Sequence, residues 1–150
     1  MGSLANASWQ SVLLAAVYTV PAAVVLIALA RPLNLLAIGE ETAHDLGADV
    51  EGGKRTAPVI AALITAAGVA VAGVIGFVGL VVPHAIRLLI GSDHRALLPL
   101  SFLGGAAFLT LADLIARLAL APTEIPIGVI TAFVGVPIFL VLLRRSLAGT

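Results

Sequence analysis

Two long apolar runs constrain what this chain can fold into. Residues 11–30 carry no formal charge, and neither do the 31 residues from 56 to 86. A helix needs about 20 apolar residues to cross the hydrocarbon core of a bilayer, so each run is long enough for a span. Charged residues make up only 11% of the chain, against roughly 25% in an ordinary soluble domain. The sequence therefore predicts an integral membrane protein.

Residues 31–55 separate the two runs and contain half of the chain's formal charges. This segment belongs in water, because a charge in the hydrocarbon core is costly. Apolar residues recur within it at roughly helical spacing, and Gly39 and Gly47 break the pattern. We predict two short amphipathic helices that lie outside the membrane.

The second run is too long for one upright helix and too short for two full passes. Basic residues favour the cytoplasmic side of a membrane. All of them except Arg117 can share that side only if the chain crosses twice between Arg55 and Arg87. A glycine-rich bend after about residue 73, followed by Pro83, indicates that the return crossing is short.

The expected fold class is an all-α, polytopic transmembrane helical bundle that forms a single membrane domain over residues 1–150. The asymmetry of basic residues is typical of the bacterial inner membrane and places the amino terminus in the periplasm. No cleavable signal peptide is visible, so the first span is expected to remain in the mature protein. The five predicted passes are residues 11–30, 56–73, 78–90, 96–116 and 127–143, with the cytoplasmic segment at 31–55.

Side-chain chemistry gives no candidate catalytic site. The chain has no Cys, no nucleophile with its base and no phosphate-binding glycine loop, so we predict that it is not an enzyme. His84 and His94 are ten positions apart, which does not bring both rings to one helical face, and His44 lies in another segment. We expect no metal and no cofactor. A formal net charge of +0 argues against nucleic acid as a partner.

Two local patterns predict packing and capping. Either Ser92 or Asp93 is expected to cap a helix that starts near His94. Small residues allow membrane helices to approach closely, and they occur at residues 104–107 and at Gly128, Thr131 and Gly135.

Longer strings carry a resemblance to a known family. GFVGLVVPHAIRLLIGSDHRALLPLSFLGGAAFLTLADLIARLAL, followed by EIPIGVITAFVGVPIFLVLLRR, resembles the FecCD-type permeases of ABC importers for iron-siderophores, haem and vitamin B12. The resemblance extends upstream through RPLNLLAIGEETAHDLGADV and, more weakly, through MGSL and Trp9. It covers nearly the whole chain, but only the carboxy-terminal half of family members. We therefore expect a fragment, a split gene product or a misplaced start.

The resemblance implies partners and a coupling surface. An ATP-binding cassette ATPase would dock in the cytoplasm, a substrate-binding protein in the periplasm, and a second permease copy or the missing amino-terminal half within the membrane lipid. The segment at residues 34–49 is similar to coupling helices, with apolar anchors and an acidic rim. A helix lying on lipid is the alternative reading of this pattern. The residues implied in coupling are Leu35, Leu36, Ile38, Gly39, Glu40, Glu41, His44, Asp45, Leu46 and Gly47.

Arg117 is the lone basic residue on the predicted periplasmic side. The resemblance implies that it pairs with a carboxylate of the binding protein. Its spacing from Asp113 equally predicts an ion pair within one helical face. For Asp113 we favour such a structural pairing over a proton or ion relay, because no second carboxylate lies within a predicted span.

Three functions follow from these patterns. The first is the permease of an ATP-driven importer, in which a partner subunit hydrolyses ATP. The second is a non-transporting membrane scaffold or half-permease that needs a separate amino-terminal half. The third, an ion-coupled carrier, lacks support because no charged residue falls at a helix midpoint. The substrate itself is not encoded in these patterns.

Overall fold

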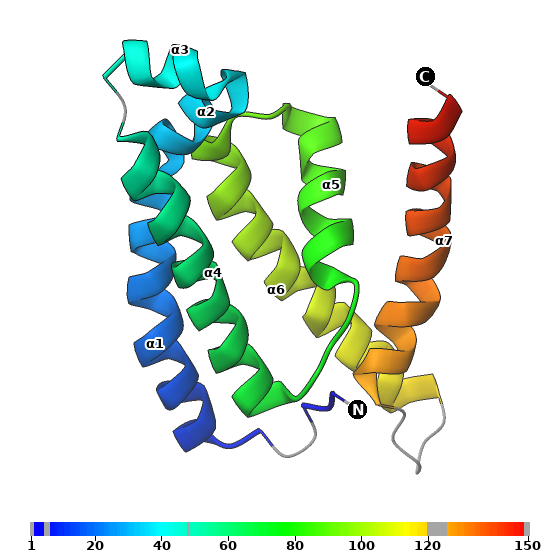
Figure 1. Ribbon diagram of the computed structural model, residues 1–150. Helices are drawn as coiled ribbons and strands as arrows, with labels where there is room; N and C mark the ends of the chain where they lie inside the picture. The colour runs from blue at the N-terminus through cyan, green and yellow to red at the C-terminus, as the bar shows by residue number, and fades with distance from the viewer. Residues whose placement is uncertain (1, 5–6, 48, 120–125, 149–150) are drawn as a thin grey trace.

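A computed structural model describes residues 2–4, 7–47, 49–119 and 126–148. Helices account for all the regular structure in those ranges, which confirms the predicted all-α class (Figure 1). They are α1 (Trp9–Ala28), α2 (Ala30–Ile38), α3 (Glu40–Asp45), α4 (Val50–Ala72), α5 (Val78–Ile90), α6 (His94–Ala119) and α7 (Ile127–Ala148).

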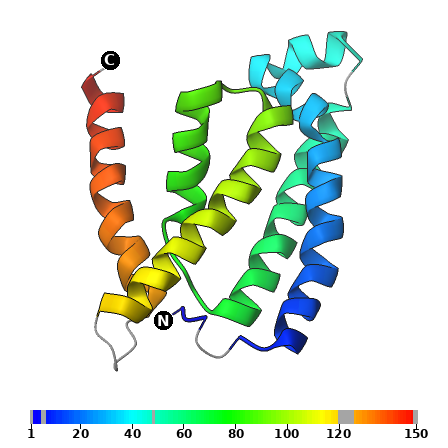
Figure 2. The ribbon, with the colours of Figure 1, turned by 180° about the vertical axis from the view of Figure 1, so that it is seen from behind.

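Five of the helices, α1, α4, α5, α6 and α7, run alternately up and down the molecule (Figures 1 and 2). Helix α1 packs along α4, and α5 packs along α6. The short helices α2 and α3 lie together at one end of this bundle, and the α5–α6 connection lies at the same end (Figure 1). The amino terminus and the α4–α5 connection lie at the opposite end.

Side chains at the helix ends explain where α1 and α4 begin. Ser8 caps α1 by accepting a hydrogen bond from the backbone N–H of Ser11 at 3.2 Å. Asp49 caps α4 in the same way, accepting from Gly52 at 2.9 Å. This cap lets α4 start at Val50, ahead of the apolar run at residue 56, so the end of the predicted cytoplasmic segment 31–55 is helical.

The bend between α4 and α5 falls where the glycine pattern predicts it. Helix α4 ends at Ala72, and the next residue, Gly73, has φ 71° and ψ −172°, a conformation that a side chain disfavours. Among the described residues, Phe77, immediately before α5, is the non-glycine residue with positive φ, at 67°. The return helix α5 then spans only 13 residues.

Small side chains dominate the interior, and large apolar side chains point outward. Ala30, Ala112 and Ala116 are buried, whereas Trp9 and Phe133 are 88% and 83% exposed. In water such a surface would be unfavourable, because burial of apolar area drives folding. Among the described residues, α1, α4 and α6 are long and apolar enough to cross a membrane, and Val78–Ile90 and Ile127–Val141 are shorter apolar helices.

Two of the predicted small residues do lie at close helix contacts. A Cβ at Gly104 in α6 would lie 3.0 Å from Ile86 Cδ1 and 3.2 Å from Val82 Cγ1, both in α5. A Cβ at Gly135 in α7 would overlap the side chain of Phe77. The absence of these methyl groups allows α6 to approach α5 and α7 to approach the α4–α5 bend.

The first described residues form a strap across the end opposite α2 and α3. Gly2 N–H donates to the Val74 carbonyl at 3.1 Å, and Ser3 N–H donates to the Ala72 carbonyl at 2.9 Å. Leu4 packs against a buried cluster of Ala112, Ala116 and Ile127. The strap thus satisfies the Ala72 carbonyl at the end of α4, which helical bonding leaves open, and the Val74 carbonyl in the connection that follows.

Candidate functional site

The helix pair α2–α3 forms a short hairpin at one end of the bundle (Figure 1). Gly39 joins the helices with φ 138° and ψ 148°, a backbone conformation that L side chains rarely adopt. Within the hairpin, Ala43 of α3 is fully buried, and Ala30 at the start of α2 is 2% exposed. The sequence therefore fixes a compact turn that holds two short helices outside the apolar part of the bundle.

The predicted apolar anchors divide between the inside and the outside of the hairpin. Leu36 faces inward, since a Cβ at Gly53 of α4 would lie 3.4 Å from its Cδ1. Leu35 is half-buried. Ile38 and Leu46 are 67% and 62% exposed. Only Ile38 and Leu46 therefore present large apolar surface to a partner, while Leu36 secures the hairpin on α4.

The acidic residues of α3 surround a hollow of about 530 Å³ that faces the start of α4. Lys54 Nζ in α4 pairs with Glu40 Oε1, which ties the two helices together. The side chains of Glu41 and Asp45 are exposed, as is His44. The surface of α3 is therefore acidic, with one carboxylate already neutralised from within the chain.

A hydrogen-bonded cluster links α2 to the start of α6. Asn34 Nδ2 donates to Asp93 Oδ1 at 2.6 Å, and the His94 backbone N–H donates to Asn34 Oδ1 at 2.8 Å. The His94 ring Nδ1 also lies 2.6 Å from Asn34 Oδ1. Sequence reasoning missed this cluster. The available signal was a single amide side chain, Asn34, among the leucines of α2.

Asp93 caps α6, and it is one of the two residues, with Ser92, that the sequence predicted for this role. Its Oδ1 accepts the Arg95 backbone N–H at 3.0 Å, and its carbonyl accepts from Leu97 at 2.8 Å. The hydrogen bond from Arg95, followed by the one from Asn34, holds the pKa of the Asp93 carboxyl below its ordinary value. The charged form of this carboxylate is therefore favoured at the junction.

Arg117 lies near the other end of α6 and is paired within the chain. Its Nε is 2.9 Å from Asp113 Oδ2, one helical turn earlier. This confirms the structural pairing expected for Asp113. The guanidinium side chain is still 47% exposed, so the ion pair does not bury the predicted docking residue.

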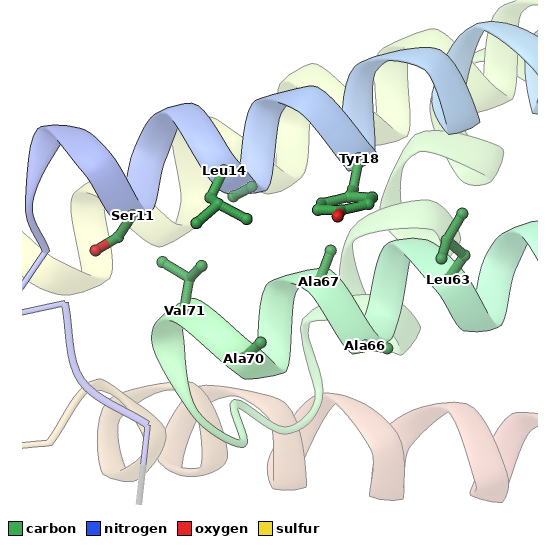
Figure 3. A pocket seen from close by; sticks show the side chains of 9 residues that line it. Ser11, Leu14, Tyr18, Leu63, Ala66, Ala67, Ala70 and Val71 are labelled. Carbon is green, nitrogen blue, oxygen red and sulfur yellow. The ribbon is translucent and has the colours of Figure 1, made fainter.

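An apolar groove of about 440 Å³ opens between α1 and α4 (Figure 3). Leu14 and Tyr18 of α1 face Leu63 and Val71 of α4, and three alanines of α4 line the floor between them. Ser11 and Tyr18 supply the polar groups among the lining residues. None of those lining residues is charged, so the groove does not suit an ionic ligand.

The three histidines lie on three different helices. His44 is in α3, His84 in α5 and His94 at the start of α6. Within the described ranges, no group of three or more His, Cys, Asp or Glu side chains is arranged to hold a metal ion. The α2–α3 hairpin, with its exposed carboxylates and its hydrogen bonds to the start of α6, forms the candidate functional site.

Comparison with known proteins gives a consistent result. The family model described as the FecCD transport family matches residues 1–145. A cobalamin import system permease of Halobacterium salinarum is 52% identical over 144 residues, covering 96% of this chain and 38% of the relative. A hemin transport system permease of Yersinia pestis is 48% identical over 146 residues, covering 97% of this chain and 44% of the relative.

A solved structure shares the fold. It belongs to an ABC transporter assigned to the metal-chelate type, in an inward-facing conformation, and it is 37% identical with a TM-score of 0.88. The match covers 96% of this chain and 46% of the solved chain. The chain therefore spans less than half the length of each of these proteins.

Proposed function

Because the chain belongs to the FecCD transport family, we propose that it forms part of the membrane-spanning permease of an ATP-driven importer. The named relatives import cobalamin and hemin, so we propose a chelate of this class as the substrate: an iron-siderophore, haem or a corrinoid. ATP would be hydrolysed by a partner subunit, because this chain contains no phosphate-binding glycine loop.

The observation that carries this proposal is the α2–α3 hairpin. It combines a turn at Gly39, two exposed apolar side chains, Ile38 and Leu46, and the exposed carboxylates of Glu41 and Asp45. Apolar anchors within a polar rim are typical of protein interfaces. We propose that an ATP-binding cassette subunit with basic residues around an apolar groove docks here.

Charge placement supports a cytoplasmic location for this end. Helices α2, α4, α5 and α6 all bring a basic residue to the end of the bundle that carries the hairpin (Figure 1). These residues are Arg31, Lys54, Arg55, Arg87 and Arg95. Under the positive-inside rule this end faces the cytoplasm, and we propose the bacterial inner membrane as the location.

The opposite end would then face the periplasm. Arg117 is half-exposed there and would meet a carboxylate of the substrate-binding protein. An exposed pair of this kind contributes about 0–1 kcal/mol and mainly sets encounter rate and orientation. We propose that the transport pathway is completed by a second permease copy and by the helices that the longer relatives contain.

Site-directed crosslinking tests the docking surface. The chain has no native Cys, so Glu41→Cys and His44→Cys each introduce a unique thiol on α3. We expect both to crosslink to a co-expressed ATP-binding cassette subunit. The matched control is Val74→Cys, which is 70% exposed but lies after α4 at the opposite end. Equal crosslinking at all three positions, or at none, would refute docking at α2–α3.

Transport requires a separate test, because the chain spans only 38–44% of the two named relatives. The chain is expressed alone, and also joined to the preceding helices of the Yersinia pestis relative. ATP-dependent haemin uptake by the chimera, lost on removal of α3, would support the importer function. Assembly without uptake in both forms would instead favour a membrane scaffold.

A further inference from the structure

Hydrogen bonds from one side chain, Asn34, join α2 to the start of α6. We propose that Asn34 is a positioning residue that locks the docking hairpin to α6, so that displacement of α2 by a partner moves α6 directly. This proposal rests on the proposed ATPase docking, but its structural part can be tested without any partner. Asn34, Asp93 and His94 together are called the α2–α6 joint.

The chemistry of Asn34 suits a joint. Its amide both donates and accepts, and both functions are used: Nδ2 bonds the Asp93 carboxylate, and Oδ1 accepts the His94 backbone N–H. A bond to a charged acceptor is stronger than a neutral one. One side chain therefore bridges the loop before α6 and the first peptide of α6 itself.

The joint also shares its carboxylate with the helix cap. Asp93 Oδ1 accepts from Asn34 at 2.6 Å and from the Arg95 N–H at 3.0 Å. Any movement of α2 that carries Asn34 away removes a partner from His94 N–H and from Asp93 at once. The bond from the His94 N–H to Asn34 is part-buried, and a shielded N–H left without a partner costs free energy, so α2 and the first turn of α6 are favoured to move together.

The other attachments of the hairpin lack this directionality. Leu36 contacts Gly53 of α4 through apolar atoms, and Glu40 pairs with Lys54 on an exposed surface. Dispersion contacts and a single ion pair tolerate sliding, whereas two hydrogen bonds to one planar amide, one exposed and one part-buried, fix both distance and orientation. Because of the joint, we expect a movement of α2 to displace α6 rather than α4.

Amide hydrogen exchange on the full chain in detergent micelles tests the joint. Asn34→Ala should speed exchange at least about fivefold at the first turn of α6 and in α2, because it removes two hydrogen bonds and the loss of even one has about this effect. Asn34→Asp should do at least as much, because two carboxylates would face each other. The matched control is Ser92→Ala, an exposed side chain in the same loop, which should leave exchange unchanged.

A reciprocal exchange separates the joint from a general loss of folding. In Asn34→Asp/Asp93→Asn the amide and the carboxylate trade places, so the new Asn can donate to the new Asp and still accept from Arg95. We expect this double variant to restore slow exchange relative to Asn34→Asp. Slow exchange in Asn34→Ala, or no recovery in the double variant, would overturn the proposal.

The transmission of movement from a docked partner to α6 is tested with an ATP-binding cassette subunit crosslinked to the Glu41→Cys variant. Binding should alter exchange at the first turn of α6 when Asn34 is present, and this response should disappear in Asn34→Ala although the crosslink still forms. A response that persists without Asn34 would show that α6 is coupled by another route and would overturn the joint. Failure of the crosslink with Asn34 in place would instead count against ATPase docking, and the partner-free exchange data would then decide the joint alone.

Discussion

Arg117 Nε lies 2.9 Å from Asp113 Oδ2, one turn earlier on α6. The Asp113 side chain is 24% exposed and the Arg117 side chain 47% exposed. The carboxylate is thus shielded on the helix flank while the guanidinium reaches outward. The pair accordingly serves two needs at once, since it neutralises a carboxylate near the end of an apolar helix and leaves part of a cation at the surface.

Exchanging the two charged residues separates the neutralisation of the carboxylate from the exposure of a cation at the surface. Asp113→Arg/Arg117→Asp keeps an i,i+4 ion pair but reverses the charge that reaches the surface. We expect thermal stability in detergent to stay within about 1 kcal/mol of the unmodified chain. If Arg117 meets a carboxylate on a substrate-binding protein, affinity for that protein should fall. Affinity that is unchanged in the exchanged chain would restrict Arg117 to its structural pairing.

Gly135 gives a prediction about packing. Gly135→Ala places a methyl group where the Phe77 side chain lies, so it should lower the free energy of unfolding by about 1–3 kcal/mol, as overpacking does. Gly105→Ala is the matched control, because a Cβ at Gly105 meets nothing within 4 Å. That control should be neutral or stabilising by up to about 1 kcal/mol. Equal effects in a thermal unfolding assay would contradict the α7 contact.

Asp93 gives a prediction about pH. Hydrogen bonds from Arg95 and Asn34, together with the nearby charges of Arg95 and His94, lower its pKa below the ordinary value of 3.8. A carboxyl with a lowered pKa stabilises the fold above its unfolded pKa, and this contribution is lost as the pH falls through the folded value. The first turn of α6 should therefore loosen below about pH 4. Exchange corrected for intrinsic rates should show this step, and Asp93→Asn should abolish it.

The pair between Lys54 and Glu40 should contribute little to global stability. The two side chains are 43% and 64% exposed, and exposed pairs contribute about 0.2–1 kcal/mol. A double-mutant cycle with Lys54→Ala and Glu40→Ala should give a coupling energy in that range, and high salt should reduce it. Exchange in α3 should increase more than exchange in α4. A coupling above 2 kcal/mol would show that the pair is better shielded than its exposure indicates.

The helices of this protein could be predicted well because apolar runs, glycines and caps are local signals. The bend after Gly73, the short helix from Val78 to Ile90 and the cap at Asp93 all follow from neighbouring residues. The start of α4 at Val50 was harder to predict, because the polar first turn of this helix lies before the apolar run that begins at residue 56. Residues 120–125, between the predicted passes 96–116 and 127–143, lie outside the described residues.

The arrangement of the candidate site could not be predicted from local patterns, because it depends on contacts between residues that are far apart in the sequence. Asn34 and Asp93 are 59 positions apart in sequence, and nothing in either local pattern indicates their partnership. Leu36 is a second example. Its helical spacing places it with the exposed apolar residues Ile38 and Leu46, although it packs on Gly53. Hydropathy spacing identifies an amphipathic helix, but it does not decide which apolar residues the rest of the chain covers.

The strap at residues 2–4 has a consequence for how this protein can be handled. Gly2 is buried against Ile75 and Val74, so an affinity tag joined just before it would have to leave through a packed junction. A tag at the carboxyl end would instead project from the end of the molecule that carries α2 and α3 (Figure 1), where it could obstruct a docking subunit. Purification and labelling are therefore better served by a long carboxy-terminal spacer, or by a single engineered thiol at an exposed site such as Trp9, than by a short fusion at either end.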